Sequence, residues 1–237
     1  MGPNIKICGL HPEDDFSFTV HARVTHAGFV FVPKSKRFVS PQQARVAVQS
    51  LQETCQVMAV VAGMDLIEIR DSLSLSGITG VQLHGEEPPT WCDDLCNRGY
   101  TVWKAVRVPT PDLLDVSKTI AHVMREISVY LRHVDGILLD ASPPVNAAHG
   151  VTGGYGKTFM WDILPTIGTW LQQDSDRPFL WVAGGLHSGN VTELLSVWQP
   201  DGLDVSSGVE ENGRKSVTKI MDLIEAVEKH AGHSNLS

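Results

Sequence analysis

Short apolar runs alternate along the chain with longer segments in which apolar residues recur every three or four positions. The runs are rich in Val, Ile and Leu and are bounded by Gly or polar residues, which is typical of buried strands. The pattern predicts eight strands, at residues 4–10, 27–32, 57–62, 80–85, 101–108, 136–141, 179–183 and 202–206. The segments between them predict helices, at residues 12–25, 41–51, 65–75, 88–97, 111–133, 159–172, 189–197 and 217–230.

The number of strand–helix units distinguishes between architectures. An open doubly wound sheet usually has about five to seven strands and a glycine fingerprint after the first. No such fingerprint follows Leu10. Eight alternating units in 237 residues instead predict a (β/α)8 TIM barrel of the α/β class. We expect a single domain over residues 1–237, with residues 231–237 as a frayed tail.

Composition narrows the range of partners. The formal net charge of -8 argues against nucleic acid and anionic membranes, because proteins that bind them present a basic face. No apolar run approaches the roughly 20 residues that span a bilayer, and no signal sequence stands at the start. The four cysteines have no zinc-ligand spacing, so we expect reduced thiols and no metal. These features predict a cytoplasmic protein, a monomer or a homodimer, that acts on a small molecule.

In a TIM barrel the active site lies at the C-terminal ends of the strands, so polar residues there are candidates. They are Cys8, Arg37, His84, Arg107, Asp140, Gly184, Gly185, Ser206, Ser207 and Gly208. The glycine and serine pairs follow the seventh and eighth strands, where barrels commonly bind phosphate through backbone N–H groups. The run at residues 153–158 ends in Gly-Lys-Thr but lacks the Walker spacing, so it predicts a lid containing Gly154 rather than a nucleotide loop.

Asp140 and Cys8 are the pair that could exchange protons with a substrate. A carboxyl group at a barrel mouth can act as an acid, and a thiol beside cations has its pKa lowered and can act as a base. Lys6 and Arg37 could supply the cations. The alternatives are a capping role for Asp140, a buried hydrophobe for Cys8 and a solvated loop charge for Arg37.

Two further residues receive structural interpretations. His84 is interpreted as a packed or capping histidine. Lys6 and Asp204 have positions that would bring them together between the adjoining first and eighth strands of a closed barrel. A buried ion pair there is favoured over a catalytic amine at Lys6.

Seven blocks of the sequence, in order, resemble phosphoribosylanthranilate isomerase. They are KICGL at 6–10, GFVF at 28–31 with SKR at 35–37, VQLHGE at 81–86, LLD at 138–140, GGYGKTF at 153–159, AGGL at 183–186 and DVSSGVE at 204–210. The match covers nearly the whole chain, and the Lys36-Arg37 pair is similar to fungal members. Departures from the usual family residues stand at His11, Lys36, Tyr155, Met160 and Ser216.

The resemblance implies an isomerase of tryptophan biosynthesis that needs no metal or organic cofactor. Its Amadori rearrangement converts N-(5'-phosphoribosyl)anthranilate to 1-(2-carboxyphenylamino)-1-deoxyribulose 5-phosphate. It also implies that Cys8 is the general base, Asp140 the general acid and Arg37 the partner of the anthranilate carboxylate. The alternatives are another phosphosugar isomerase on the same barrel and a non-catalytic phosphosugar-binding paralogue.

Overall fold

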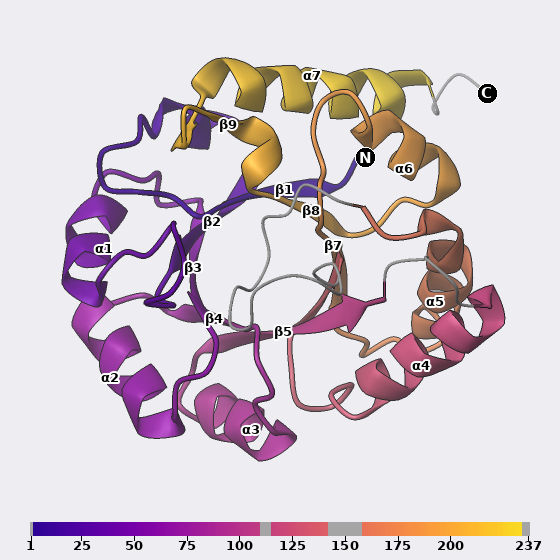
Figure 1. Ribbon diagram of the computed structural model, residues 1–237, viewed down its shortest axis with the longest axis horizontal. Helices are drawn as coiled ribbons and strands as arrows, with labels where there is room; N and C mark the ends of the chain where they lie inside the picture. Colours follow the sequence, from indigo (N-terminus) through magenta and orange to yellow (C-terminus); the bar gives the residue numbers. More distant parts are fainter. Residues whose placement is uncertain (1, 110–114, 142–157, 234–237) are drawn as a thin grey trace.

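The computed structural model describes residues 2–109, 115–141 and 158–233. Eight parallel strands pair in sequence order and close into a barrel, with the helices outside them, as Figure 1 shows. The predicted TIM barrel is therefore confirmed. The strands are β1 (Asn4–Cys8), β2 (Val24–Val30), β3 (Gln56–Val61), β4 (Gly80–Leu83), β5 (Thr101–Val108), β6 (Gly136–Ala141), β7 (Phe179–Val182) and β8 (Gly202–Val205).

Two of the helices that cover the barrel begin at a capping box. Ser40 and Asp65 each form a capping box at the start of a helix, which satisfies backbone N–H groups that have no partner within the helix. The α-helices are α1 (Pro41–Val48), α2 (Leu66–Ser76), α3 (Pro89–Asn97), α4 (Val116–Ser128), α5 (Leu164–Leu171), α6 (Val191–Val197) and α7 (Val217–His233). Within the described residues, no helix is long and apolar enough to cross a membrane.

The helix predicted at residues 12–25 is wrong. Only a 3-10 turn, η1 (Ser17–Val20), forms there, and β2 already begins at Val24. The carboxylates of Asp14 and Asp15 accept hydrogen bonds from the backbone N–H groups of His11 and Ser17. Such local bonds favour turns over a continued helix.

Other boundaries differ less. The predicted helix at 159–172 divides into η2 (Trp161–Ile163) and α5, while α7 continues past residue 230 to His233. Part of the predicted helix at 111–133 and the predicted lid with Gly154 lie outside the described residues.

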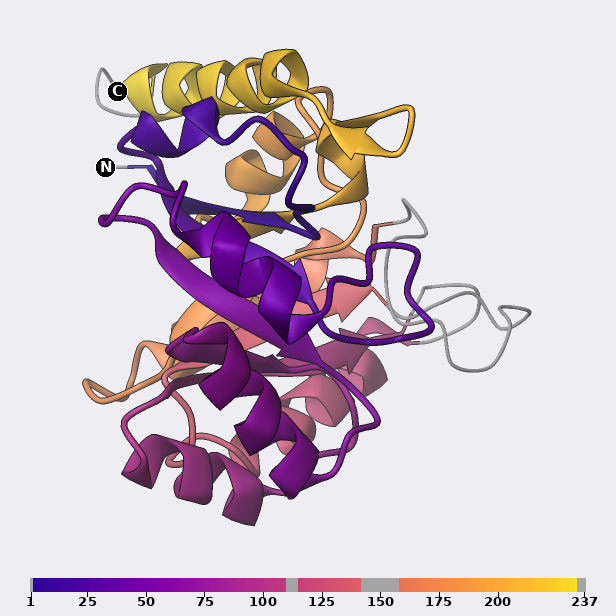
Figure 2. The ribbon, with the colours of Figure 1, turned by 90° about the vertical axis from the view of Figure 1, so that its left-hand side faces the viewer.

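A small hairpin after β8 was not predicted. After η3 (Ser207–Val209), strands β9 (Glu210–Glu211) and β10 (Arg214–Lys215) pair antiparallel. Asn212 and Gly213 join them with φ angles of 49° and 78°, the left-handed conformation of a tight two-residue hairpin turn. Figure 2 shows this hairpin and the loop after β2 on the same face of the barrel, away from the chain's N-terminus.

The barrel interior is layered. Near the N-terminal ends of the strands, the rings of His26, Trp103 and Trp181 pack with centroids 4.4 to 4.9 Å apart. Burial lowers the pKa of His26 to about 4, and the nearby Lys6 adds to this effect, so the ring is neutral at pH 7. The aromatic rings fill the barrel near the N-terminal ends of the strands, and the polar side chains lie nearer the C-terminal ends.

Candidate active site

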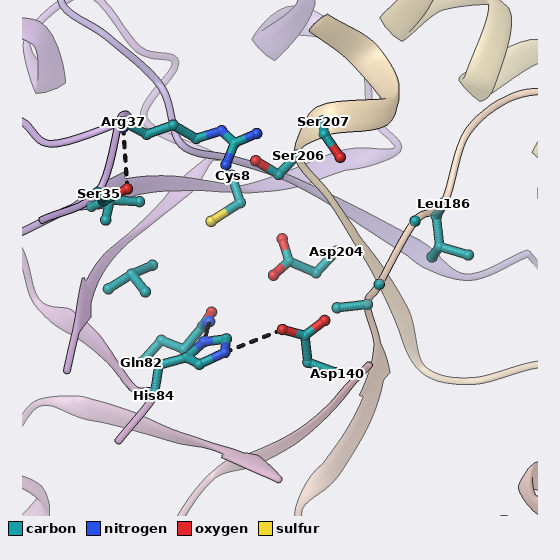
Figure 3. Close-up of a pocket in the computed structure, with 15 residues that line it drawn as sticks. Cys8, Ser35, Arg37, Gln82, His84, Asp140, Leu186, Asp204, Ser206 and Ser207 are labelled. Atoms are coloured by element: carbon teal, nitrogen blue, oxygen red, sulfur yellow. Dashed lines mark hydrogen bonds and ion pairs between the residues drawn. The ribbon is translucent and has the colours of Figure 1, made fainter. Parts of the chain in front are cut away.

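A pocket opens at the C-terminal mouth of the barrel, and Figure 3 shows the side chains around it. It brings together most of the residues predicted to form a site, namely Cys8, Arg37, Asp140, Gly184, Gly185, Ser206 and Ser207. Gln82, His84 and Asp204 also line it. Arg107 is exposed to solvent and is not among the lining residues.

Asp140, near the end of β6, faces His84 just beyond the end of β4. The Nε2 atom of His84 lies 3.2 Å from Oδ2 of Asp140 (Figure 3). Both side chains are almost buried, at 10% and 11% exposure. His84 therefore lines the pocket beside Asp140, a place that its interpretation as a packed or capping residue did not give it. Its place at a strand end, two residues after the inward-facing Gln82, was the available signal.

Cys8 ends β1 on the other side of the pocket, and Gly28 of the adjacent β2 leaves room for it. A Cβ atom at Gly28 would lie 2.9 Å from Sγ of Cys8 and 3.2 Å from Cε of Lys6. This close approach explains why β2 carries a glycine opposite the thiol.

The pKa of the Cys8 thiol is raised, whereas the sequence predicted that it would be lowered. Burial is the largest cause, and the carboxylate of Asp204 acts in the same direction. Lys6 and Lys215 lower the pKa but do not outweigh burial. The prediction was based on nearby cations alone. The sequence does not show how far burial in the barrel wall removes water from the thiolate.

The predicted ion pair between Lys6 and Asp204 is confirmed. The two residues are register partners on β1 and β8, and Nζ of Lys6 lies 3.0 Å from Oδ2 of Asp204. Nζ also donates a hydrogen bond of 2.7 Å to Oε1 of Gln82. Burial opposes the charged form of Lys6, but its pKa is raised overall, chiefly by the charge of Asp204, so Lys6 remains an ammonium ion.

Arg37 is held in place by Glu210, a residue the sequence analysis did not select. Its Nε and Nη2 atoms donate to the two carboxylate oxygens of Glu210 at 2.6 and 2.9 Å. The Arg37 side chain is only 11% exposed, which excludes a freely solvated charge. The Asn212-Gly213 turn was the signal that could have predicted a hairpin placing Glu210 beside the mouth.

Glu210 also binds Lys215, which connects the arginine to the loop after β8. Nζ of Lys215 donates to Glu210 at 2.8 Å and to the carbonyl and hydroxyl oxygens of Ser206. Burial alone would raise the pKa of Glu210, but hydrogen bonds from Arg37 and the charge of Lys215 lower it to about 2. Glu210 is therefore ionised, and the two cations are fixed on one side of the pocket.

The loops after β7 and β8 approach each other closely. Gly184 and Gly185 have φ angles of 90° and 62°, a conformation that glycine adopts without strain. A Cβ atom at Gly208 would collide with the carbonyl oxygen of Leu186, so this glycine lets the loops touch rather than lining the pocket itself. The backbone of both loops thus borders one corner of the pocket, near Arg37 and Lys215.

A carboxyl group and a thiol face one cavity, and glycine and serine loops stand where barrels commonly bind phosphate. Together with the fold, this arrangement defines a TIM-barrel enzyme that transfers protons on a small phosphorylated substrate. The family model for N-(5'phosphoribosyl)anthranilate (PRA) isomerase matches residues 5–226. The chain belongs to this family, and it is an isomerase of tryptophan biosynthesis, as the sequence blocks predicted.

Similar proteins support the assignment over nearly the full length. The N-(5'-phosphoribosyl)anthranilate isomerase of Brevibacillus brevis is 33% identical over 232 residues, covering 98% of this chain and 96% of its own. Monomers generated from the dimeric Thermotoga maritima enzyme share 30% identity and a TM-score of 0.73, with 96% of this chain and 99% of that one covered. A phosphoribosylanthranilate isomerase solved with reduced 1-(o-carboxyphenylamino)-1-deoxyribulose 5-phosphate has 28% identity and a TM-score of 0.71, covering 96% and 99%.

Proposed function

We propose that this chain converts N-(5'-phosphoribosyl)anthranilate to 1-(2-carboxyphenylamino)-1-deoxyribulose 5-phosphate, with Asp140 as the general acid and Cys8 as the general base. The observation that carries the proposal is their placement around one pocket, with Asp140 on β6 and Cys8 on β1 (Figure 3). An acid and a base from different strands can act on different atoms of one bound sugar.

Two proton transfers at the sugar begin the reaction. Asp140 donates a proton to the furanose ring oxygen, and the anilino nitrogen expels that oxygen from C1', which opens the ring to a protonated Schiff base. Cys8 then removes the proton from C2'. The C–H electron pair forms a double bond between C1' and C2', and the C=N pair moves to the nitrogen, which gives an enolamine. The enolamine tautomerises to the ketone, so the net reaction is an isomerisation.

Binding at both ends would orient the sugar between these groups. Two nitrogens of Arg37 are engaged by Glu210, which leaves Nη1 with hydrogens for the anthranilate carboxylate. The phosphate would accept hydrogen bonds from the loops that contain Gly184, Gly185, Ser206, Ser207 and Gly208. Gly154, which lies outside the described residues, is also proposed to bind substrate. Binding the carboxylate and the phosphate at the two ends of the substrate would hold the reacting carbons in place between Asp140 and Cys8.

The raised pKa of Cys8 bears on when it acts. In the empty pocket burial favours the neutral thiol. Ring opening creates a positive charge on the Schiff base, and a cation near a thiol favours the thiolate. We therefore propose that the thiol of Cys8 loses its proton to solvent most readily after Asp140 has opened the ring, which leaves a thiolate to take the proton from C2'. The second step then depends on the first.

The test is the Asp140→Asn variant in an isomerase assay. The amide keeps the shape of the side chain but has no acidic proton, so turnover should fall by roughly the 10²- to 10⁴-fold that a positioned acid contributes. The control is Asp201→Asn, at the other end of the barrel, where the carboxylate binds Arg177 at 2.9 Å. The control should keep its turnover per folded molecule. Near-normal turnover of a folded Asp140→Asn protein would contradict the acid assignment.

Complementation of a tryptophan auxotroph that lacks this isomerase tests the function itself. Growth would support the proposed reaction, and failure by a folded, expressed protein would favour a binding paralogue instead. We further propose a single-domain cytoplasmic protein, without metal or organic cofactor, that is a monomer or a homodimer. Light scattering would distinguish the two assembly states.

A further inference from the structure

Four almost buried polar side chains form a continuous row inside the barrel, from Lys6 on β1 to Asp140 on β6. Nζ of Lys6 lies 2.7 Å from Oε1 of Gln82, and Nε2 of Gln82 lies 3.1 Å from Nδ1 of His84. Nε2 of His84 in turn lies 3.2 Å from Oδ2 of Asp140. Figure 3 shows Gln82 beside His84 and the contact from His84 to Asp140. We call these four residues the inner hydrogen-bond chain.

Lys6 fixes the direction of the chain at its first link. An ammonium group has three donors and no acceptor, so it can only donate to Gln82. The amide of Gln82 must therefore turn its oxygen towards Lys6 and its NH2 group towards His84. The opposite orientation would place amide hydrogens against a positive charge in a buried site. Lys6 is 0% exposed and lies 3.0 Å from the carboxylate of Asp204, whose charge raises the pKa of Lys6 and so favours the ammonium form that can only donate.

The amide then decides the tautomer of His84. Because its NH2 group is a donor, Nδ1 of His84 must be the acceptor and carries no hydrogen. A ring with hydrogens on both nitrogens would put an N–H group against the amide hydrogens. The single ring hydrogen of His84 is therefore on Nε2, the atom that faces Asp140.

The last link concerns the two oxygens of Asp140. With a hydrogen on Nε2, His84 donates to Oδ2, so Oδ2 acts as an acceptor. When Asp140 is in its acid form, the proton must then be on Oδ1. Oδ1 is directed at the loop after β7, since a Cβ atom built on Gly184 would lie 3.2 Å from it. Gly184 lines the pocket, and its missing side chain leaves space beside that oxygen.

We propose that Lys6 and Gln82 are positioning residues, which impose one tautomer on His84 and thereby confine the acid proton of Asp140 to Oδ1. This inference rests on the proposed role of Asp140 as the general acid. A carboxyl group that could place its proton on either oxygen would spend part of its time with the proton turned towards His84. Fixing the proton aligns it before the substrate arrives, as the orienting residue of a catalytic triad fixes its histidine.

Nitrogen-15 NMR of the wild-type protein tests the tautomer directly. The signals of His84 can be assigned by their loss in His84→Asn. The proposal predicts a hydrogen on Nε2 and none on Nδ1. A hydrogen on Nδ1 in the wild-type protein would overturn it.

Gln82→Glu tests the catalytic consequence. A carboxylate at position 82 accepts from Lys6 and also from Nδ1 of His84, so the hydrogen should move from Nε2 to Nδ1. The bare Nε2 atom would then accept the proton of Asp140 at Oδ2. We expect kcat to fall roughly 10- to 10²-fold with KM changed by less than about threefold, because an orientation is lost but the groups that bind the two ends of the substrate remain.

Gln82→Met distinguishes the effect of a wrong His84 tautomer from the effect of losing the hydrogen bonds of Gln82. It removes both hydrogen bonds but imposes no wrong tautomer, so its kcat should lie between those of Gln82→Glu and the wild type. A purely structural role for Gln82 predicts the reverse order, because a glutamate can keep its bond to Lys6 and a methionine cannot. If Gln82→Glu fails to fold, the wild-type NMR measurement and Gln82→Met still decide the proposal.

The chain offers a matched control in a second glutamine–histidine pair. Oε1 of Gln56 accepts a hydrogen bond from Nε2 of His26 over 3.0 Å, and Nε2 of Gln56 donates to Oγ1 of Thr101 at 2.8 Å, near the other end of the barrel. Gln56→Glu should leave kcat unchanged. A reversed tautomer in Gln82→Glu with normal kcat would overturn the positioning role while leaving the acid role of Asp140 intact. Normal turnover of Asp140→Asn would overturn both.

Discussion

Replacing Lys6 with methionine tests how the barrel tolerates a charge in its interior. The substitution keeps the length of the side chain and removes the ammonium group, which is 0% exposed. Asp204 then loses its partner at 3.0 Å, and Oε1 of Gln82 loses a donor at 2.7 Å. Neither group can turn to bulk water, because Gln82 is 1% and Asp204 7% exposed. The main effect should therefore be on stability.

The magnitude follows from the geometry. Two unit charges 3.0 Å apart attract by about 5.5 kcal/mol at an effective dielectric constant of about 20. Part of this attraction offsets the cost of burying both charges, and breaking a buried pair from one side typically costs roughly 3 to 5 kcal/mol. We expect a loss in the free energy of unfolding within that range. A typical domain is stable by only about 5 to 15 kcal/mol, so the variant should be close to unfolding.

The loss should depend on pH. Burial raises the pKa of Asp204 even beside Lys6, which lowers it, so removing Lys6 should raise the pKa of Asp204 in the folded protein further above its unfolded value. At this site the folded variant then binds a proton more readily than the unfolded chain, so the contribution of Asp204 to stability is greatest below about pH 4 and falls as the pH rises. The difference from the wild type should thus be smallest in acid and largest near neutrality.

Urea unfolding at several pH values measures these quantities. Asp204→Asn combined with Lys6→Met is the control, because it removes both charges and should recover more than half of the loss at neutral pH. A Lys6→Met protein with full stability but no activity would refute the structural role. It would place Lys6 in the catalytic set rather than among the positioning residues.

Two further substitutions test the thiol of Cys8 and the ion pair between Arg37 and Glu210. Cys8→Ser should fold normally but lose roughly 10²- to 10⁴-fold in turnover, because a hydroxyl is far harder to ionise than a thiol; reduced thermal stability with normal turnover would instead identify a packed thiol. Glu210 has its pKa lowered to about 2 from 4.5, so it stabilises the fold above about pH 4.5 and this stabilisation is lost as the pH falls towards 2. Glu210→Gln should therefore flatten the stability profile between those values in acid unfolding curves, and an unchanged profile would contradict the assignment.

The sequence by itself determined the architecture and most of the site. Eight apolar runs with intervening amphipathic segments specify eight strands and their covering helices. A strand buried on both faces is apolar throughout, whereas a helix buried on one face has apolar residues every three or four positions. Side-chain alternation predicted that Lys6 and Asp204 share the barrel interior, and the register of β1 with β8 confirms it. Strand ends also located Cys8 and Asp140, since parallel strands present their C-terminal ends on one face.

The tertiary structure decided the contacts between segments far apart in the chain. His84 follows β4 and Asp140 lies on β6, and Arg37 and Glu210 are 173 residues apart, so no local pattern specifies either pair. The turn at Asn212-Gly213 marks a hairpin but not the arginine that its glutamate binds.

Hydration also depends on the complete barrel. The cationic residues expected near Cys8 predicted a lowered pKa for its thiol, whereas burial raises that pKa. The direction of the inner hydrogen-bond chain has the same origin, because Gln82 can be oriented by Lys6 only where water is excluded. Periodicity records which side a residue faces, while the energy of a charge or a hydrogen bond depends on everything packed around it.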